Sequence, residues 1–569
     1  MPSDTKDDES LRRAGSNKVG DVSAGIVIDE ISRAGGLRRV LGNRQIQLLS
    51  AGGAIGTALF ISIGAALTKG GPASLVIAFT LYSAVLASIN NSVAEMTTHM
   101  PVAGGFVRLA GYWVDDALGF MAGWNFFFFE ALAIPFEITA MSFVSSFWSE
   151  RVTDPGPTAA ICAGCIIVYG LLNMVAVKVY GESEFWLSSG KIILLLMLFS
   201  FTFITMVGGN PKGDAYGFRY WSNPGAFAEY LSQGDLGRFQ GFLACLYTAA
   251  FTIVGPEYIS MAAAETKHPS VYVKEAYKTV YYRLCFFFVV GALAVSVVVP
   301  YDNPTLRDLW FGTGTGNGSA AGSPYVLAMS ILGINVLPHI VNALILTSIF
   351  SAGNTYCFCA CRVLHGLALE GRAPQILART TKSGTPIYAF GVVLCFACLS
   401  FLQVSSGTAT VLSWMTSLIT GGGQINYIVM AVTFLRYHKA CNVQGIDRKT
   451  RPYYGCLQPY STWLAIGMQI FICLSLGYTS FRPWDVGSFF ASYTMQMLMP
   501  VLFIAWKLYH KTRMVAAAGV DLVWERPFID AYEAAETEIP TGFWAEMASL
   551  IGFRKDKQSS LEALTPSGT

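Results

Sequence analysis

Residues 46–67 read IQLLSAGGAIGTALFISIGAAL, a stretch without a charged side chain. A transmembrane helix needs about 20 predominantly apolar residues, so this stretch is long enough to cross a bilayer. Gly52, Gly53 and Gly56 interrupt it where a continuous helix would otherwise run. In a bilayer, unwound backbone is tolerated only where it lines a cavity or is buried in protein. The stretch therefore predicts a broken membrane helix at a binding site, or, alternatively, small residues that allow close helix packing.

Further apolar stretches of spanning length follow along the whole chain, and with the first they predict an all-α membrane protein of twelve transmembrane helices. The stretch 323–369 is also long enough to hold a loop helix before its span. The predicted spans after the first are 73–96, 118–148, 158–179, 185–207, 239–264, 284–299, 336–369, 387–404, 408–435, 463–481 and 489–508.

The composition agrees with a lipid environment. Of the 569 residues, 53% are apolar and only 13% are charged, against about 25% charged in an ordinary globular protein. The net charge of +2 gives no basic field of the kind that suggests nucleic acid as a partner. The sequence also lacks a nucleotide-binding glycine motif, a metal-spaced ligand set and a nucleophile arrangement, so we expect no enzyme activity and no cofactor or metal.

The distribution of basic residues predicts the orientation. If the N-terminus is cytoplasmic, the positive-inside count assigns roughly thirty basic residues to the cytoplasm and about seven to the exterior. We therefore expect an N-terminal cytoplasmic tail at 1–44, a transmembrane permease domain at 45–513 and a C-terminal cytoplasmic tail at 514–569. A glycosylation sequon at Asn317 falls in a predicted exterior loop, in agreement with this orientation.

The sixth span is also interrupted. It contains FTIVGPEYISMAAAE at 251–265, in which Gly255 and Pro256 break the helix and Glu257 follows directly. Proline removes a donor and frees a carbonyl about one turn earlier, so the backbone near Val254 could accept from an ammonium. Broken helices at corresponding positions of two halves are the pattern of an inverted-repeat transporter with its binding site at the midplane.

Ionisable residues inside predicted spans are candidates for function, because they are expensive in lipid and usually face the bundle interior. They are Glu137, Lys191, Glu257 and His339. Glu137 and His339 could instead be satisfied packing groups, and Lys191 could extend its ammonium to the interface. Lys191 lies within an apolar run, where an ammonium is sensitive to neighbouring carbonyls and carboxylates, so it is a candidate for proton coupling.

The third span carries the aromatic run GWNFFFFEALAIPFE at 123–137. Aromatic faces attract cations, including substituted ammonium groups. Successive residues point around a helix in turn, so Phe126 to Phe129 cannot all face one cavity. We therefore expect most of these rings to pack against neighbouring helices or lipid.

Several motifs make the chain resemble the fungal amino-acid permease family of the amino acid, polyamine and organocation superfamily, from residue 45 to about residue 513. The resemblance implies a five-plus-five inverted-repeat core followed by two more helices. It also implies proton-driven import of amino acids across the plasma membrane, with both termini cytoplasmic. The motifs are AGGAIGTALF, GGPASLVIAF, AEMTTHMPVAGGFVR, DDALGFMAGWN, PFEI, GESEFWLSSGKI, AAFTIVGPEYISMAAAE, VVVPYDNP, HIVNALILTSIFSAGNTYCFCACR and GTPIYAF.

The same resemblance implies roles for individual residues. The carboxylate of the substrate would be held by the backbone and hydroxyl donors of Ile55, Gly56, Thr57 and Ala58. The amine would be covered by Phe251 and accepted by the backbone at Val254, and Lys191 would face the first helix and serve proton coupling. From their positions inside the spans, Glu257 is a further candidate for substrate binding and Glu137 for proton coupling.

The chain departs from the usual family pattern at three positions. Ala54, Ala58 and Pro256 stand where the family usually has Thr, Gly and Thr. The methyl group of Ala58 would narrow the pocket floor, and Pro256 removes an amide and a hydroxyl. One alternative is a carnitine or polyamine permease, since the aromatic run also resembles that branch. A second is a transporter-like nutrient receptor with little flux.

Overall fold

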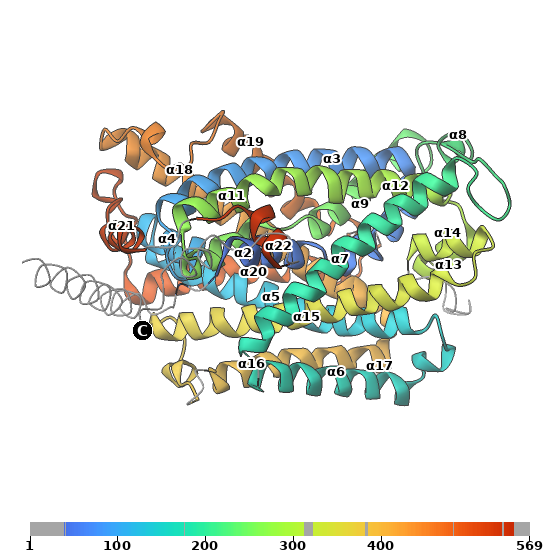
Figure 1. The fold of residues 1–569 in the computed structure, drawn as a ribbon, viewed down its shortest axis with the longest axis horizontal. Coiled ribbons are helices and arrows are strands. Elements are labelled where there is room, and N and C mark those ends of the chain that lie inside the picture. The colour runs from blue at the N-terminus through green and yellow to red at the C-terminus, as the bar shows by residue number, and fades with distance from the viewer. Residues whose placement is uncertain are drawn as a thin grey trace, which may run out of the picture.

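The computed structural model of the chain describes residues 39, 41–175, 177–311, 323–381, 385–481, 483–536 and 540–550. Asn317 of the predicted sequon and most of the predicted N-terminal tail lie outside these residues. The described part is built from helices, packed side by side with their axes roughly parallel to the long axis of Figure 1.

The described residues form 11 helical stretches that are long and apolar enough to cross a membrane. Each overlaps a predicted span from the second onward, and most ends differ by a few residues, but the helices of the second and seventh spans begin well before the predicted 73 and 284. They are Ser62–His99, Asp116–Ser145, Pro155–Met174, Trp186–Met206, Gly234–Glu265, Pro269–Val298, Leu337–Leu369, Ile387–Ser406, Thr408–Val443, Tyr460–Ser480 and Val486–His510.

The first predicted span is interrupted, as its glycines indicate. It consists of α2 (Asn43–Ala54), a short turn of helix η1 (Thr57–Leu59) and the first part of α3 (Ser62–His99). The second span is the rest of α3, which bends at Gly71, where φ is 77°. A Cβ atom at Gly71 would lie 2.7 Å from the backbone nitrogen of Ala228, so only glycine fits this bend. With this interrupted span, the described chain has the predicted twelve.

The sixth span is interrupted at the predicted position. α9 (Gly234–Thr252) ends before an unwound segment at 253–255, and α10 (Pro256–Ala262) follows. Pro256 occupies the first turn of α10, where its missing N–H leaves no helical bond unmade. The two interrupted spans lie against each other, because α10 contacts α2 and η1 contacts α9.

The third and eighth spans form the centre of the bundle. α5 (Asp116–Ser145) packs along α15 (Leu337–Leu369), and α18 (Thr408–Val443) packs on the same α5. α7 (Val177–Met206) crosses the bundle diagonally and contacts both α2 and α15 (Figure 1). Contact between the first and sixth spans, and between the third and eighth, is consistent with two five-helix repeats.

The remaining spans and connections surround this core. The predicted loop helix before the eighth span is present as α14 (Pro324–Ile331). The outer helices and loop elements are α4 (Gly105–Trp113), η2 (Glu150–Thr153), α6 (Pro155–Val175), α8 (Arg219–Ser222), η3 (Ala263–Glu265), α11 (Pro269–Arg283), η4 (Leu284–Val289), α12 (Val290–Val298), α13 (Pro304–Phe311), η5 (Gln375–Ala378), α16 (Ile387–Ala397), η6 (Cys398–Leu402), α17 (Gln403–Ser406), η7 (Arg448–Thr450), α19 (Tyr460–Ser475), η8 (Tyr478–Ser480), α20 (Val486–His510), η9 (Ala517–Gly519), α21 (Arg526–Ala535) and α22 (Phe543–Leu550).

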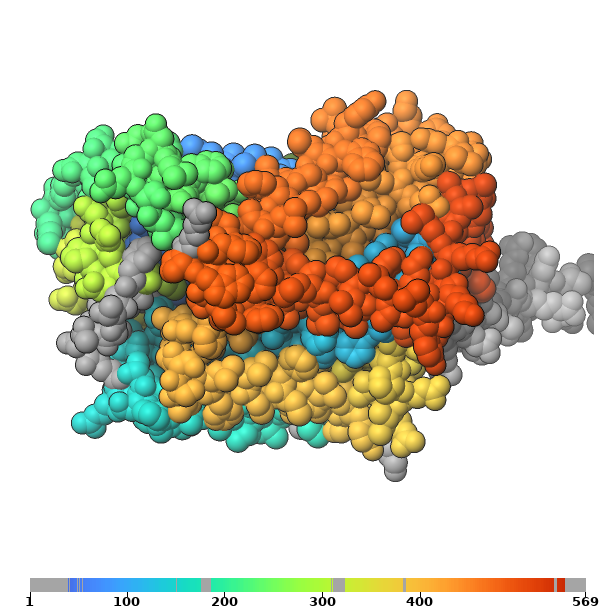
Figure 2. Space-filling view, turned by 180° about the vertical axis from the view of Figure 1, so that it is seen from behind, coloured from blue at the N-terminus to red at the C-terminus, as the bar shows by residue number. Residues whose placement is uncertain are grey.

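The two ends of the bundle differ. α4 and α21 lie at one end, which we call the tail end, and α8, α13 and α14 lie at the other, which we call the loop end (Figure 1). Figure 2 shows α20 and the orange-red residues after it lying over the outside of the bundle.

Much of the predicted C-terminal tail is folded onto the tail end. We call residues 515–536 and 540–550 the C-terminal strap. Its Val515 donates to the carbonyl of Val114 at 2.8 Å. Ser270 donates through its backbone N–H to Glu533 at 2.8 Å. The backbone N–H of Arg44 in α2 donates to Glu546 at 3.0 Å. The strap therefore ties α4, α11 and α2 together.

Candidate functional site

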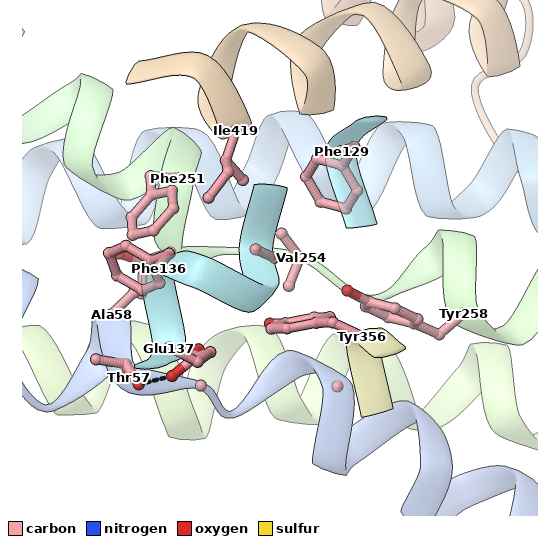
Figure 3. Close-up of a pocket in the computed structure, with 14 residues that line it drawn as sticks. Thr57, Ala58, Phe129, Phe136, Glu137, Phe251, Val254, Tyr258, Tyr356 and Ile419 are labelled. Carbon is pink, nitrogen blue, oxygen red and sulfur yellow. Dashed lines mark hydrogen bonds between the residues drawn. The ribbon is translucent and has the colours of Figure 1, made fainter. Parts of the chain in front are cut away.

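A cavity lies where the two interrupted spans meet α5 and α15 (Figure 3). Its volume is about 30 Å³, which is enough for a water molecule or two, so side chains must move before an amino acid fits. The described residues that line it are Gly53, Gly56, Thr57, Ala58, Phe129, Ala133, Phe136, Glu137, Phe251, Thr252, Val254, Tyr258, Tyr356 and Ile419.

The first interrupted span contributes backbone to the cavity wall. Gly56 is extended, with φ −108° and ψ −170°, and η1 begins directly after it at Thr57. The hydroxyl of Thr57 donates a hydrogen bond to the carboxylate of Glu137 across the cavity (Figure 3). A Cβ atom at Gly56 would lie 3.5 Å from the hydroxyl of Tyr356 and 3.6 Å from Glu137 Oε1. Gly56 therefore leaves free the space that any larger side chain would take from a substrate.

Lys191 connects α7 to the break in the first span. Its side chain is 1% exposed, and its Nζ donates a hydrogen bond of 2.8 Å to the backbone carbonyl of Gly52. Its positive charge also acts on the carboxylate of Glu137. Lys191 is not among the described residues that line the cavity, but it contacts the broken backbone and acts on Glu137.

The sixth span contributes Phe251 and Val254 to the opposite wall. Gly255 has φ 153° and ψ −43°, a backbone conformation that glycine adopts far more readily than other residues. Glu257 accepts a hydrogen bond of 3.1 Å from the N–H of Gly255. It also accepts from the hydroxyl of Tyr427 at 3.1 Å. Glu257 is thus bonded to the break itself, and it is absent from the described cavity lining.

The structure brings most of the predicted site residues together. Gly56, Thr57, Ala58, Phe251, Val254 and Glu137 all line the cavity, whereas Ile55, Glu257 and Lys191 lie outside its described lining. Ile55 is buried and 1% exposed. His339, a weaker candidate, is exposed near the start of α15, where its Nδ1 accepts from Trp148 at 3.1 Å.

Of the four successive phenylalanines, only Phe129 lines the cavity. Phe126 packs edge-on against Phe106 at 5.4 Å between ring centres. Phe127 packs against Phe396 of α16 at 5.5 Å. The expectation that most of these rings serve packing is confirmed.

Two tyrosines in the cavity were missed by the sequence analysis. Tyr258 follows Glu257 directly in α10, and Tyr356 lies on α15 within a run of small and polar residues. A signal was available for Tyr258, because it lies within the first turn of a half-helix that begins at the break. Tyr356 carries no such signal in the sequence.

Comparison with known proteins identifies the class of protein. A family model described as amino acid permease matches residues 45–516. The chain belongs to this amino acid permease family, and is therefore a multi-pass membrane protein of the amino acid transport class. Permeases are transporters rather than enzymes.

Individual relatives are similar over most of their length. The general amino acid permease AGP2 of Saccharomyces cerevisiae is 43% identical, over 83% of this chain and 79% of that protein. A proline-specific permease of the same organism is 38% identical, over 85% of this chain and 77% of the relative. A proline-specific permease of Emericella nidulans is 35% identical, over 91% and 94% of the two chains.

Proposed function

We propose that this protein imports amino acids together with protons across the plasma membrane, with both termini in the cytoplasm. The observation that carries the proposal is the cavity between two interrupted spans, which has Gly56 and Thr57 on one wall and Val254 on the other. Transporters with interrupted helices bind the charged ends of their substrates with the freed backbone groups at such breaks.

The two walls suit the two charged groups of an amino acid. Backbone N–H groups at the start of a helical turn favour an anion, so Gly56, Thr57 and Ala58 hold the substrate carboxylate. The unwound backbone at Val254 offers carbonyl oxygens to the ammonium. Phe251 closes the space above them, packed edge-on against Phe136 at 5.1 Å between ring centres.

The rest of the lining favours an uncharged, apolar side chain on the substrate. Phe129, Ala133 and Ile419 contribute carbon surface to the cavity. Contact with apolar surface stabilises an apolar side chain, while a second charge there would lose its hydration. Two of the relatives are named proline-specific permeases, which supports small apolar amino acids over carnitine or a polyamine.

Proton coupling is assigned to Lys191 and Glu137. The ammonium of Lys191 bonds the carbonyl of Gly52, and it acts on Glu137. Movement of α2 relative to α7 would break this bond, so the position of the broken span and the charge on these two groups depend on each other. The positively charged side chain of Lys191 thereby takes the role that a bound cation has in other transporters with broken helices.

The charges at the tail end support its assignment to the cytoplasm. Arg372 lies there and pairs with Asp116 at 2.6 Å. Arg108 pairs with Glu525 of the C-terminal strap at 2.8 Å. Arginine and lysine gather on the cytoplasmic side of membrane proteins, and further arginines of this end are Arg362, Arg436, Arg448 and Arg526.

Radiolabelled uptake tests the proposal. The chain is produced in a yeast strain that lacks its own amino acid permeases, and uptake of proline, alanine, glutamate, lysine, carnitine and spermidine is compared with the empty vector. We expect uptake of the small apolar amino acids, stimulated by acidic medium and abolished by a protonophore. Uptake of carnitine or spermidine alone would contradict the substrate class, and a nutrient response without uptake would favour a receptor.

A further inference from the structure

Glu130 is a buried carboxylate that the binding roles above do not use. It lies on α5 seven positions before Glu137, and residues seven apart share one face of a helix. Its side chain is 0% exposed. Neither carboxylate oxygen has a hydrogen-bond partner in the described part of the chain.

Among the described residues, the titratable groups that interact with Glu130 include no counter-ion. They are Glu257 and Tyr258 of α10, Tyr356 of α15 and Tyr427 of α18. None of these groups is a cation. A lone carboxylate in a low-dielectric interior is stable only beside a cation or with a bound proton. A bound proton would remove this uncompensated buried charge.

Tyr258 links Glu130 to the cavity. Tyr258 lines the cavity, and its hydroxyl is close enough to interact with the Glu130 carboxylate, although neither group makes a hydrogen bond of normal geometry among the described residues. Figure 3 shows the hydroxyl ends of Tyr258 and Tyr356 both directed towards the middle of the cavity. The Tyr356 hydroxyl and Glu137 Oε1 lie 3.5 and 3.6 Å from the position that a Cβ atom on Gly56 would take. Glu137 and the Tyr356 hydroxyl therefore lie together at one end of the cavity, and Tyr258, which interacts with Glu130, lies at the other end.

We propose that Glu130 is a proton-carrying residue of the transport cycle, which passes protons from the cavity to the tail end through Tyr258. The proposal rests on the proton coupling proposed above. When the tail end opens to water, Glu130 releases its proton to the solvent. Its carboxylate then takes the proton of the Tyr258 hydroxyl while that hydroxyl takes one from Tyr356 and Tyr356 takes the proton of the Glu137 carboxyl, so both tyrosines stay neutral and the negative charge passes to Glu137. One proton moves towards the tail end, and no electron is transferred.

Glu130→Gln tests this role, because the amide keeps the shape of the side chain and cannot release a proton. Ser142→Ala is the matched control: Ser142 lies on the same helix and is also buried without a hydrogen-bond partner in the described chain. Membrane level, exchange of labelled for unlabelled substrate, and accumulation in acidic and neutral medium are measured. We expect Glu130→Gln to keep exchange and to lose acid-driven accumulation by about 100-fold, whereas Ser142→Ala behaves as the unmodified protein.

A second variant keeps the test decisive if Glu130→Gln does not reach the membrane. Tyr258→Phe keeps the ring and removes only the hydroxyl, and we expect the same loss of acid-driven accumulation; because Tyr258 also lines the cavity, accumulation is expressed relative to the exchange rate of the same variant. Full acid-driven accumulation in either variant, when present at normal level in the membrane, would overturn the role of Glu130.

The unmodified protein separates this outcome from failure of the proposed function. If its accumulation survives a protonophore, proton coupling itself is wrong, and the role of Glu130 fails with it. If its accumulation collapses with the protonophore while Glu130→Gln still accumulates substrate, only the role of Glu130 is wrong.

Discussion

The hydroxyl of Thr57 donates its hydrogen bond to the carboxylate of Glu137, and both residues line the same cavity. A hydroxyl has only one proton to donate. Thr57 can therefore serve Glu137 or the carboxylate of a substrate, but not both at once. Binding of the substrate at the first interrupted span thus changes the surroundings of an acidic group on α5, which gives a direct physical link between cargo and proton.

Removal of the Thr57 hydroxyl should weaken substrate binding and should also change the surroundings of Glu137. We expect Thr57→Val to raise KM for the substrate by about tenfold, since a hydrogen bond to a charged group contributes about 1.5–3 kcal/mol. Thr57→Ser retains the hydroxyl and should keep KM near the original value. Uptake kinetics at matched membrane levels check this prediction, and an unchanged KM in Thr57→Val would leave the substrate carboxylate to the backbone alone.

Gly56→Leu should abolish transport without preventing insertion, because a leucine side chain would extend past its Cβ into the space beside Tyr356 and Glu137. The control is Gly164→Leu on α6, where a Cβ atom would meet nothing within 4 Å. Uptake and surface labelling are compared between the two variants. Equal uptake in both would show that Gly56 does not border the substrate.

Lys191→Met keeps an apolar stem of similar length and removes the ammonium that bonds Gly52 at 2.8 Å. We expect accumulation driven by a pH gradient to be lost, while exchange of bound substrate partly survives. The measurement is labelled uptake into vesicles with and without an imposed pH gradient. Undiminished accumulation in the gradient would make Lys191 a structural charge and would leave coupling to the carboxylates.

Glu257→Gln should lower the transport rate by disturbing the break in the sixth span. The carboxylate accepts from both Gly255 and Tyr427, and an amide has a single oxygen with which to accept. Tyr427→Phe removes one of the same bonds, so the effects of the two substitutions should be less than additive in the double variant. Strictly additive effects on the rate would show that the two residues act separately.

A buried ion pair at the tail end should control stability. Glu95 is 0% exposed and accepts from Arg448 Nε at 2.5 Å. Glu95→Gln leaves a largely buried guanidinium without its counter-charge, which we expect to cost about 3–5 kcal/mol. The control is Glu229→Gln, because Glu229 pairs with Arg238 at 3.8 Å on the exposed surface, where an ion pair contributes about 0–1 kcal/mol. Thermal unfolding in detergent should show a clear fall in Tm for Glu95→Gln alone.

The membrane helices could be predicted from the sequence because length and apolar content alone define a span. The breaks could also be predicted, since the glycines of the first span and Gly255 with Pro256 of the sixth fall at corresponding positions of two halves. At Gly255 the structure gives the reason directly, as its φ of 153° favours glycine.

Which side chains point into the cavity could not be predicted in the same way. A central membrane helix is apolar on every side, so the periodicity that identifies the inner face of a soluble helix is lost. Tyr356 on α15 therefore looked no different from its neighbours, and Phe129 no different from Phe128. The packing of the C-terminal strap against the bundle could not be predicted for the opposite reason. Its residues are polar enough to pass for a solvated tail, although Ile529 and Tyr532 are buried against the bundle.

The bond from Arg44 to Glu546 joins residues that are 502 positions apart. A ribosome adds about 5–20 residues per second, so the half-helix α2 is made roughly half a minute to two minutes before the residue that completes its end. Throughout that interval the backbone N–H of Arg44 lacks this acceptor. A truncation that removes Glu546 would thus alter the start of α2, the first membrane helix to be synthesised.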